Sequence, residues 1–135
     1  MLKTSITLVP ALAALALLAS ACGGGSSETE ETTSAGNAAA EIATIKRMLD
    51  DALGDYRHGR ARAAERTVGD AYLEHFEGLE EALEERDHEL MERLEHRIST
   101  EIRDQIKNRA PAGAIGATIA DTKRDLDRAA RALEE

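Results

Sequence analysis

Residues 76–96 read FEGLEEALEERDHELMERLEH. Nine of them are Asp or Glu, and only Arg86 and Arg93 carry a firm positive charge. On one unbroken helix, Glu77, Glu81, Glu85 and Glu89 would stack as a row of like charges. Each such pair costs roughly a few tenths of a kcal/mol. The stretch therefore favours a break within the helix.

A break at Arg86–Asp87 would divide this row of carboxylates. Asp87 stands between two stretches with helical periodicity, and a short acidic side chain is a good N-cap. Glu89 would then lie in the first turn of the next helix, where the macrodipole favours negative charge. Four glutamates would remain at the end of the preceding helix, where the dipole disfavours them: Glu80, Glu81, Glu84 and Glu85. Such conflicts between local and global preference are enriched at functional sites.

Apolar residues spaced by three and four positions predict four helices after residue 40. Gly59 is expected to end the first as a left-handed cap, and Pro111 to separate the third from the fourth. The predicted core positions are Ile42, Ile45, Leu49, Ala52 and Tyr56; Ala64, Val68, Ala71, Tyr72, His75, Phe76, Leu79 and Leu83; Leu90, Met91, Leu94, Ile98, Ile102 and Ile106; and Ile115, Ile119, Thr122, Leu126, Ala129 and Leu133.

The connections between these segments are short, which places consecutive helices antiparallel. The sequence thus predicts an all-α fold, an antiparallel up-down-up-down four-helix bundle over residues 41–135, preceded by a disordered tether. A helical hairpin that dimerises into a bundle is the alternative.

The N-terminus has the pattern of a secretory signal. Lys3 precedes an apolar run that is too short and too kinked by Pro10 for a comfortable membrane span. The run ends in small residues before Cys22, which resembles the lipobox of prokaryotic lipoproteins. That resemblance implies cleavage of residues 1–21, a lipidated Cys22 and a membrane anchor on the extracytoplasmic face of the cell envelope. Cleavage by an ordinary signal peptidase after Ala21, leaving a free thiol, is the alternative.

Residues 22–40 contain no aromatic, Leu, Ile or Val and many Gly, Ser, Thr and Glu. Such a composition buries too little apolar surface to offset the entropy of ordering. We therefore expect a disordered linker between the anchor and the bundle.

The net charge of −9 argues against nucleic acid or anionic lipid as the main partner and favours cations or a basic protein surface. The sequence lacks a Cys-x-x-Cys-His haem motif, a phosphate-binding loop that follows a strand, and a recognisable Ser/His/Asp set. No enzyme activity is expected.

The acidic corner around the predicted break offers candidate metal ligands. Carboxylates with an imidazole suit iron, manganese or zinc, and Glu85-x-x-His88 has the spacing found in di-iron bundles. The candidate ligands are Glu81, Glu85, His88 and Glu92. A solvated, solubilising face is the competing interpretation. His75 is expected to be a hydrogen-bonded core residue, and His96 to form a surface pair with Glu92.

One pattern runs from Tyr56-x-x-Gly59 through Ala71-Tyr72, Phe76-Glu77-x-Leu79-Glu80 and Leu94-Glu95 to Ile102-Arg103. It resembles the extracytoplasmic helical domain attached to some bacterial iron permeases of the oxidase-dependent type. The family's polar positions match Glu77, Glu80, Glu95 and Arg103. Residues 76–80 echo the permease's Arg-Glu-Gly-Leu-Glu motif with Phe in place of Arg, so the iron-ligand role is not carried over.

The resemblance implies a role accessory to iron uptake, through binding of iron or of a permease partner. A protein-interaction or scaffold lipoprotein without metal is the alternative function.

Overall fold

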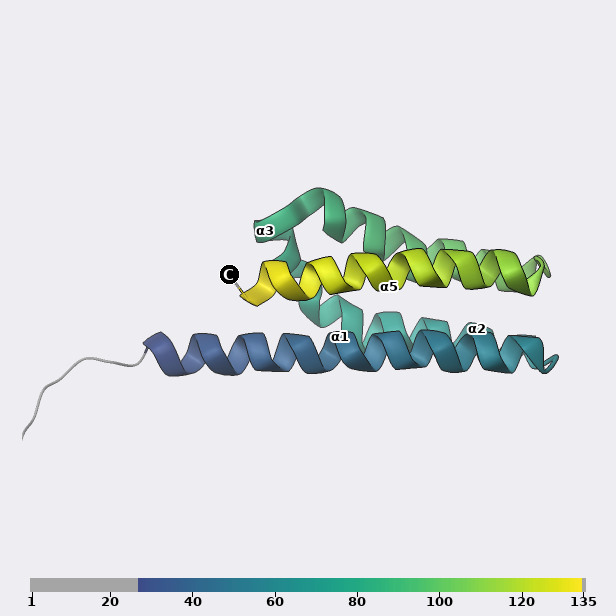
Figure 1. The fold of residues 1–135 in the computed structure, drawn as a ribbon, viewed down its shortest axis with the longest axis horizontal. Helices are drawn as coiled ribbons and strands as arrows, with labels where there is room; N and C mark the ends of the chain where they lie inside the picture. The colour runs from purple at the N-terminus through teal and green to yellow at the C-terminus, as the bar shows by residue number, and fades with distance from the viewer. Residues whose placement is uncertain (1–26, 135) are drawn as a thin grey trace, which may run out of the picture.

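The computed structural model describes residues 27–134, and their side chains from residue 36. This part of the chain is helical apart from short turns at residues 58–60 and 108–111 and contains no strand, which confirms the all-α class. The two longest uninterrupted helices, α1 (Ser27–Arg57) and α5 (Ala112–Glu134), lie side by side (Figure 1). Between them the chain runs through α2 (Ala61–Asp70), η1 (Ala71–Phe76), α3 (Glu77–Glu95), η2 (His96–Glu101) and α4 (Ile102–Lys107).

The break that the acidic stretch predicts is present inside α3. Asp87 has φ −153° and ψ 80°, which is not helical. Its Oδ1 accepts a hydrogen bond from the backbone N–H of Leu90 at 3.0 Å, so Asp87 caps the second half of α3 as predicted. The chain therefore doubles back near the end of the molecule that holds its C-terminus (Figure 1).

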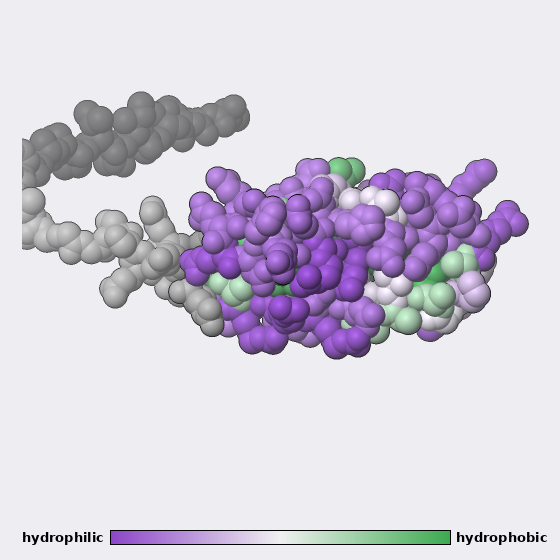
Figure 2. All heavy atoms as spheres, turned by 90° about the horizontal axis from the view of Figure 1, so that it is seen from above, coloured by the Kyte–Doolittle hydropathy of each residue, from purple (hydrophilic) through white to green (hydrophobic). Residues whose placement is uncertain are grey.

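The predicted apolar positions form one core. Phe76, at 0% exposure, is its largest side chain, and isoleucines and leucines of α1, α3, η2, α4 and α5 belong to the same core. Tyr56, Tyr72, His75, Met91 and Leu133 are half-buried at its margin. The face in Figure 2 is mostly hydrophilic, as the alternation of apolar and charged positions requires. Among the described residues, no helix combines the length and apolarity needed to cross a bilayer.

The start of α1 differs from the predicted boundary at residue 41. Residues 27–40, expected to belong to a disordered linker, are helical. Ala38 is only 9% exposed and lies one turn before Ile42. The buried face of α1 therefore extends toward the N-terminus beyond Ile42, the first branched apolar residue of the helix. Once that face is anchored, adding helical residues is nearly free for good helix formers such as Ala and Glu. The predicted signal peptide, Cys22 and residues 22–26 lie outside the described part of the chain.

Two π-helical segments, η1 and η2, were not predicted. They interrupt the α-helical pattern, and they lie in contact with each other. π-Helical turns insert an extra residue into a helix and occur often at functional sites. Here they re-aim the side chains that follow them, including the carboxylates of α3.

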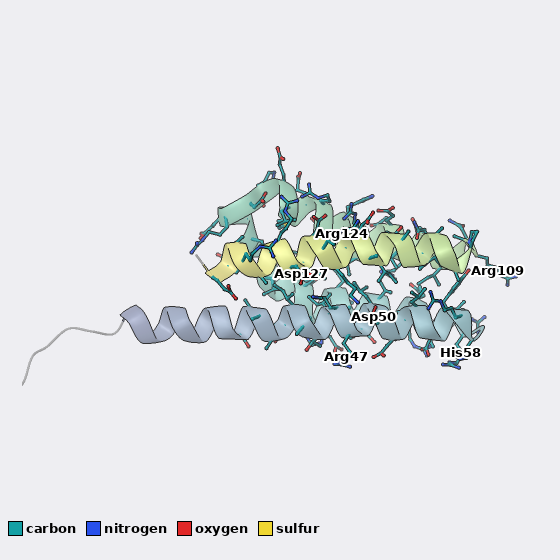
Figure 3. The ribbon with its side chains drawn as sticks, viewed as in Figure 1. Arg47, Asp50, His58, Arg109, Arg124 and Asp127 are labelled. Carbon is teal, nitrogen blue, oxygen red and sulfur yellow. The ribbon has the colours of Figure 1, made fainter. Side chains whose placement is uncertain are left out.

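The charged residues between α1 and α5 fix the register of this pair. Lys46 and Lys123 each form an ion pair at 2.5 Å, with Asp127 and Asp50 respectively. Figure 3 shows Asp50 and Asp127 between the two helices. Unlike Asp50 and Asp127, the carboxylate of Asp125 is buried, with the residue 8% exposed, and its burial was not predicted. It pairs with Arg93, Arg97 and Arg128 at 3.1, 2.7 and 3.3 Å.

Replacing Asp87 by Ala should remove the cap at the break and lower the free energy of unfolding by about 1 kcal/mol. Urea denaturation followed by circular dichroism measures this. Asp104→Ala, which removes an exposed carboxylate within α4, is the matched control and should change stability by less than about 0.5 kcal/mol. Equal effects of the two substitutions would mean that the Asp87 hydrogen bond does not define the break.

Candidate functional site

The predicted metal ligands do not come together as a set. His88 lies on the surface with 56% of its side chain exposed, between Glu84 and Glu92. Its Nδ1 is 2.7 Å from Glu84 and its Nε2 is 3.5 Å from Glu92. Glu92 lies one turn after His88 in the second half of α3, whereas Glu84 meets His88 across the break at Asp87.

The partners of His88 stabilise its protonated form. A hydrogen bond with Glu84 first, and then the charges of Glu84 and Glu92, raise the pKa of His88. Of the four predicted ligands, only His88 and Glu92 are in contact. Glu81 and Glu85 are exposed, and the other partner of His88 is Glu84, a residue of the acidic corner that was not among the four candidate ligands. Within the described residues, no group of three or more His, Cys, Asp and Glu side chains is placed to hold a metal ion. Among the described residues of the acidic corner, the ion pairs are those of His88 with Glu84 and Glu92.

A second group of carboxylates gathers where the π-helical segments meet. We call Glu77, Glu80 and Glu95, with Tyr72 among them, the carboxylate cluster. Glu80 and Glu95 are half-buried, and Glu77 is exposed. The charges of all three act on Tyr72, whose pKa is raised to about 12 by burial first and then by the hydrogen bond and charge of Glu80.

Glu80 is the member of the carboxylate cluster whose ionised form is disfavoured by its surroundings. Burial raises its pKa, the charges of Glu95 and Glu77 raise it further, and the hydrogen bond from Tyr72 opposes them. Its Oε1 is buried and accepts no hydrogen bond from any described residue. A buried acceptor without a donor costs free energy, and the raised pKa means that the ionised form of Glu80 is disfavoured at this position.

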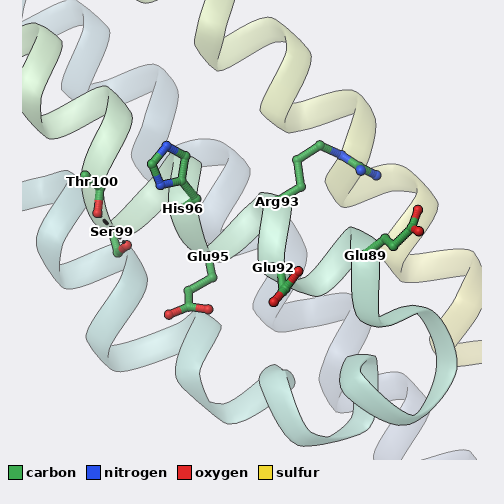
Figure 4. A pocket seen from close by; sticks show the side chains of 7 residues that line it. All are labelled: Glu89, Glu92, Arg93, Glu95, His96, Ser99 and Thr100. Atoms are coloured by element: carbon green, nitrogen blue, oxygen red, sulfur yellow. Dashed lines mark hydrogen bonds between the residues drawn. The ribbon is translucent and has the colours of Figure 1, made fainter.

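A groove of about 650 Å³ lies next to this cluster. We call it the acidic groove, and its lining residues are Glu89, Glu92, Arg93, Glu95, His96, Ser99 and Thr100 (Figure 4). Figure 4 shows Glu95 pointing from its helix toward the neighbouring one, while Arg93 points away toward α5. Arg93 is held there by Asp125 at 3.1 Å. The groove consequently presents its carboxylates and the His96 imidazole without a matching free guanidinium.

The remaining family-like position, Arg103, lies apart from the cluster. Its Nη2 is 2.6 Å from Glu65 of α2, so it joins two helices and does not face Glu95. The predicted surface pair of His96 with Glu92 is not formed, and His96 lines the groove instead. His75 is a half-buried, hydrogen-bonded residue as predicted, with its Nδ1 2.5 Å from Glu41.

Comparisons with known proteins identify no protein that is related to this chain. No protein-family model, no curated protein and no solved structure matches this chain. The resemblance to the helical domain of iron permeases therefore stays an interpretation of the sequence motif alone.

Glu80→Gln should raise stability at neutral pH and flatten its dependence on pH. The pKa of Glu80 in the folded protein lies above its ordinary value of 4.5, so the folded state binds the proton more tightly. The contribution of Glu80 to the free energy of unfolding is therefore present below pH 4.5 and is lost as the pH rises through the pKa that Glu80 has in the folded protein. Glutamine carries no charge and can still accept the hydrogen bond from Tyr72.

Urea denaturation from pH 4 to pH 8 tests this. The difference between Glu80→Gln and the native protein should grow with pH. The exposed Glu81→Gln is the control and should show no such trend. A constant difference for Glu80→Gln would contradict a raised pKa.

Proposed function

We propose that this protein is a lipid-anchored, extracytoplasmic helical-bundle protein that is accessory to iron uptake. Its anchor is the lipidated Cys22 that follows a cleaved signal peptide, and it acts at the membrane surface of the cell envelope. The acidic groove and the carboxylate cluster receive a cation, which is either a metal ion or the basic side chain of a partner such as an iron permease.

The proposed architecture is the up-down-up-down four-helix bundle. The break at Asp87 and the short turns at residues 58–60 and 108–111 support it, because each lets the chain reverse direction. The contacts of α1 with α2 and α5, and of α5 with α3, are those expected between neighbours in such a bundle. This arrangement would hold the helices that carry the carboxylates at a fixed spacing.

The observation that carries the proposed function is the uncompensated negative charge around Glu95. This residue belongs both to the carboxylate cluster and to the wall of the acidic groove. Nearby Glu80 has a buried oxygen without a donor, and Arg93, the arginine that lines the groove, is already paired with Asp125. A cation entering the groove would relieve the repulsion between Glu80 and Glu95, which gives binding a favourable electrostatic term.

The chemistry of the groove fits iron as cargo. Carboxylate oxygens and an imidazole are ligands that iron accepts in either oxidation state. Because the described residues do not form a ready three-ligand cage, the ion would keep water ligands and exchange readily. Reversible binding of this kind suits capture and delivery better than storage.

Isothermal titration of the full chain with ferrous and with ferric iron tests this function. Glu80→Gln/Glu95→Gln should weaken binding by at least about tenfold, the equivalent of one charge-assisted ligand interaction. Glu81→Gln/Glu85→Gln removes the same charge from the exposed face of α3 and should leave affinity unchanged. Loss of binding only in the control pair would move the site back to the acidic corner predicted from sequence.

A second candidate function is a protein-interaction or scaffold lipoprotein that binds no metal. The absence of a three-ligand group among the described residues favours it. It predicts a partner that co-purifies from detergent-solubilised membranes in the presence of chelator and is lost with Glu80→Gln/Glu95→Gln. Loss of every interaction on chelation would rule out this second function.

A further inference from the structure

The end of the molecule formed by the turns 58–60 and 108–111 has the opposite charge character to the acidic groove. Tyr56 ties the two turns together, because its hydroxyl donates a hydrogen bond to the carbonyl of Ala110 at 2.6 Å. A cavity of about 200 Å³ opens between the start of α2 and the end of α4, lined by Ala61, Arg62, Glu65, Ile106, Lys107 and Arg109. Three cationic side chains therefore line a cavity on a protein whose net charge is −9.

The single carboxylate of this cavity is already neutralised. Glu65 accepts hydrogen bonds from Arg103 at 2.9 and 2.6 Å, and Lys107 lies 3.8 Å from Glu65 and 3.9 Å from the exposed Asp104. The hydrogen bond from Arg103 is the main cause that lowers the pKa of Glu65, which keeps it ionised and bound to its partner. Among residues 36–134, no carboxylate pairs with Arg62 or Arg109. The cavity retains an excess of positive charge.

The backbone at Arg109 supports a role for its side chain. The two turns have the same hydrogen-bond pattern, in which the third residue of each turn donates to the carbonyl five positions earlier: Arg60 to Asp55 and Ala110 to Gln105, both at 2.9 Å. The central residue of each turn is left-handed. In the first turn it is Gly59 with φ 77°, and in the second it is Arg109 with φ 57°.

Glycine adopts this conformation without steric cost, whereas arginine does not. The chain thus places a guanidinium where the equivalent turn has glycine. A residue held in an unfavourable conformation is a reason to look for function in its side chain.

We propose that Arg62, Lys107 and Arg109 form a binding site for a small phosphate-class oxyanion. Guanidinium groups bind such oxyanions through paired hydrogen bonds, and an ammonium adds a point charge. The cavity volume suits one phosphate group, and several cations match a dianion better than a single carboxylate. The first turn of α2, which has no side-chain cap, adds backbone N–H donors beside Arg62. The group is either free phosphate or the headgroup of an anionic phospholipid.

Figure 3 shows Arg109 and His58 at the same end of the molecule, away from the Asp50 and Asp127 region. The position of this site makes it independent of the acidic groove. Glu95, the groove carboxylate nearest to Lys107 in the sequence, precedes it by twelve positions of nearly continuous helix, or about 18 Å at 1.5 Å per residue. Loss of one site should leave the other intact.

Isothermal titration of the full chain with inorganic phosphate at low ionic strength tests the proposal. Arg109→Gly should weaken phosphate binding about tenfold or more, while its thermal unfolding temperature stays equal or rises because glycine suits the left-handed turn. Arg62→Gln should weaken binding similarly. Arg86→Gln, which removes an exposed guanidinium next to the Asp87 break, is the control and should bind as the native protein does.

A second arm identifies the source of the phosphate group. Co-sedimentation compares vesicles of phosphatidylglycerol with vesicles of phosphatidylcholine, and the lipid anchor contributes equally to both. Binding of free phosphate that depends on Arg109 assigns a soluble ligand, and a preference for phosphatidylglycerol that depends on Arg109 assigns a headgroup. The proposal is overturned if Arg109→Gly binds both as the native protein does, if Arg86→Gln weakens binding equally, or if the native protein binds neither.

Discussion

The rest of the structure depends on one constraint, the reversal of the chain at Asp87. If residues 76–96 formed one straight helix, α3 could not lie against both η1 and α5, and the leucines on its two halves could not share a core. The carboxylate of Asp87 satisfies the N–H of Leu90 and so stabilises the start of the second half. Because the repulsion between stacked glutamates disfavours the straight alternative, the acidic composition of this stretch and its geometry support each other.

The reversal also determines where uncompensated charge accumulates. It returns the chain so that Glu95 meets Tyr72 and Glu80, which come from the preceding helical stretch. The π-helical segments η1 and η2 touch at this level and set the direction of the side chains on both sides. Asp125 forms ion pairs with Arg93 and Arg97, so their guanidinium groups are not available to neutralise the carboxylates of this region. Buried ion pairs fix register more reliably than they add stability, and here that register leaves the groove acidic.

Charge is thus segregated along the molecule. Carboxylates dominate the groove of α3 and η2, and cationic side chains dominate the turns at the other end. A charge pattern of this kind orients a protein in the field of a membrane or a partner and raises the rate of productive encounter. For the lipid-anchored protein that we propose, orientation at the surface would matter more than diffusion through solution, because the anchor would fix its local concentration.

The sequence by itself determined the helical class, the apolar face of each helical segment, the break and cap at Asp87 and the left-handed position of Gly59. Each of these follows from interactions within a few residues, namely helical periodicity, like-charge repulsion and the backbone freedom of glycine. Only the tertiary structure decided that α1 begins before residue 41, that Glu81 and Glu85 stay apart from a common site, that Asp125 is buried among arginines, and that Glu80 and Glu95 share a cluster. These outcomes depend on contacts between segments tens of residues apart and on the extra residues of two π-helical segments, and local spacing carries no information about either.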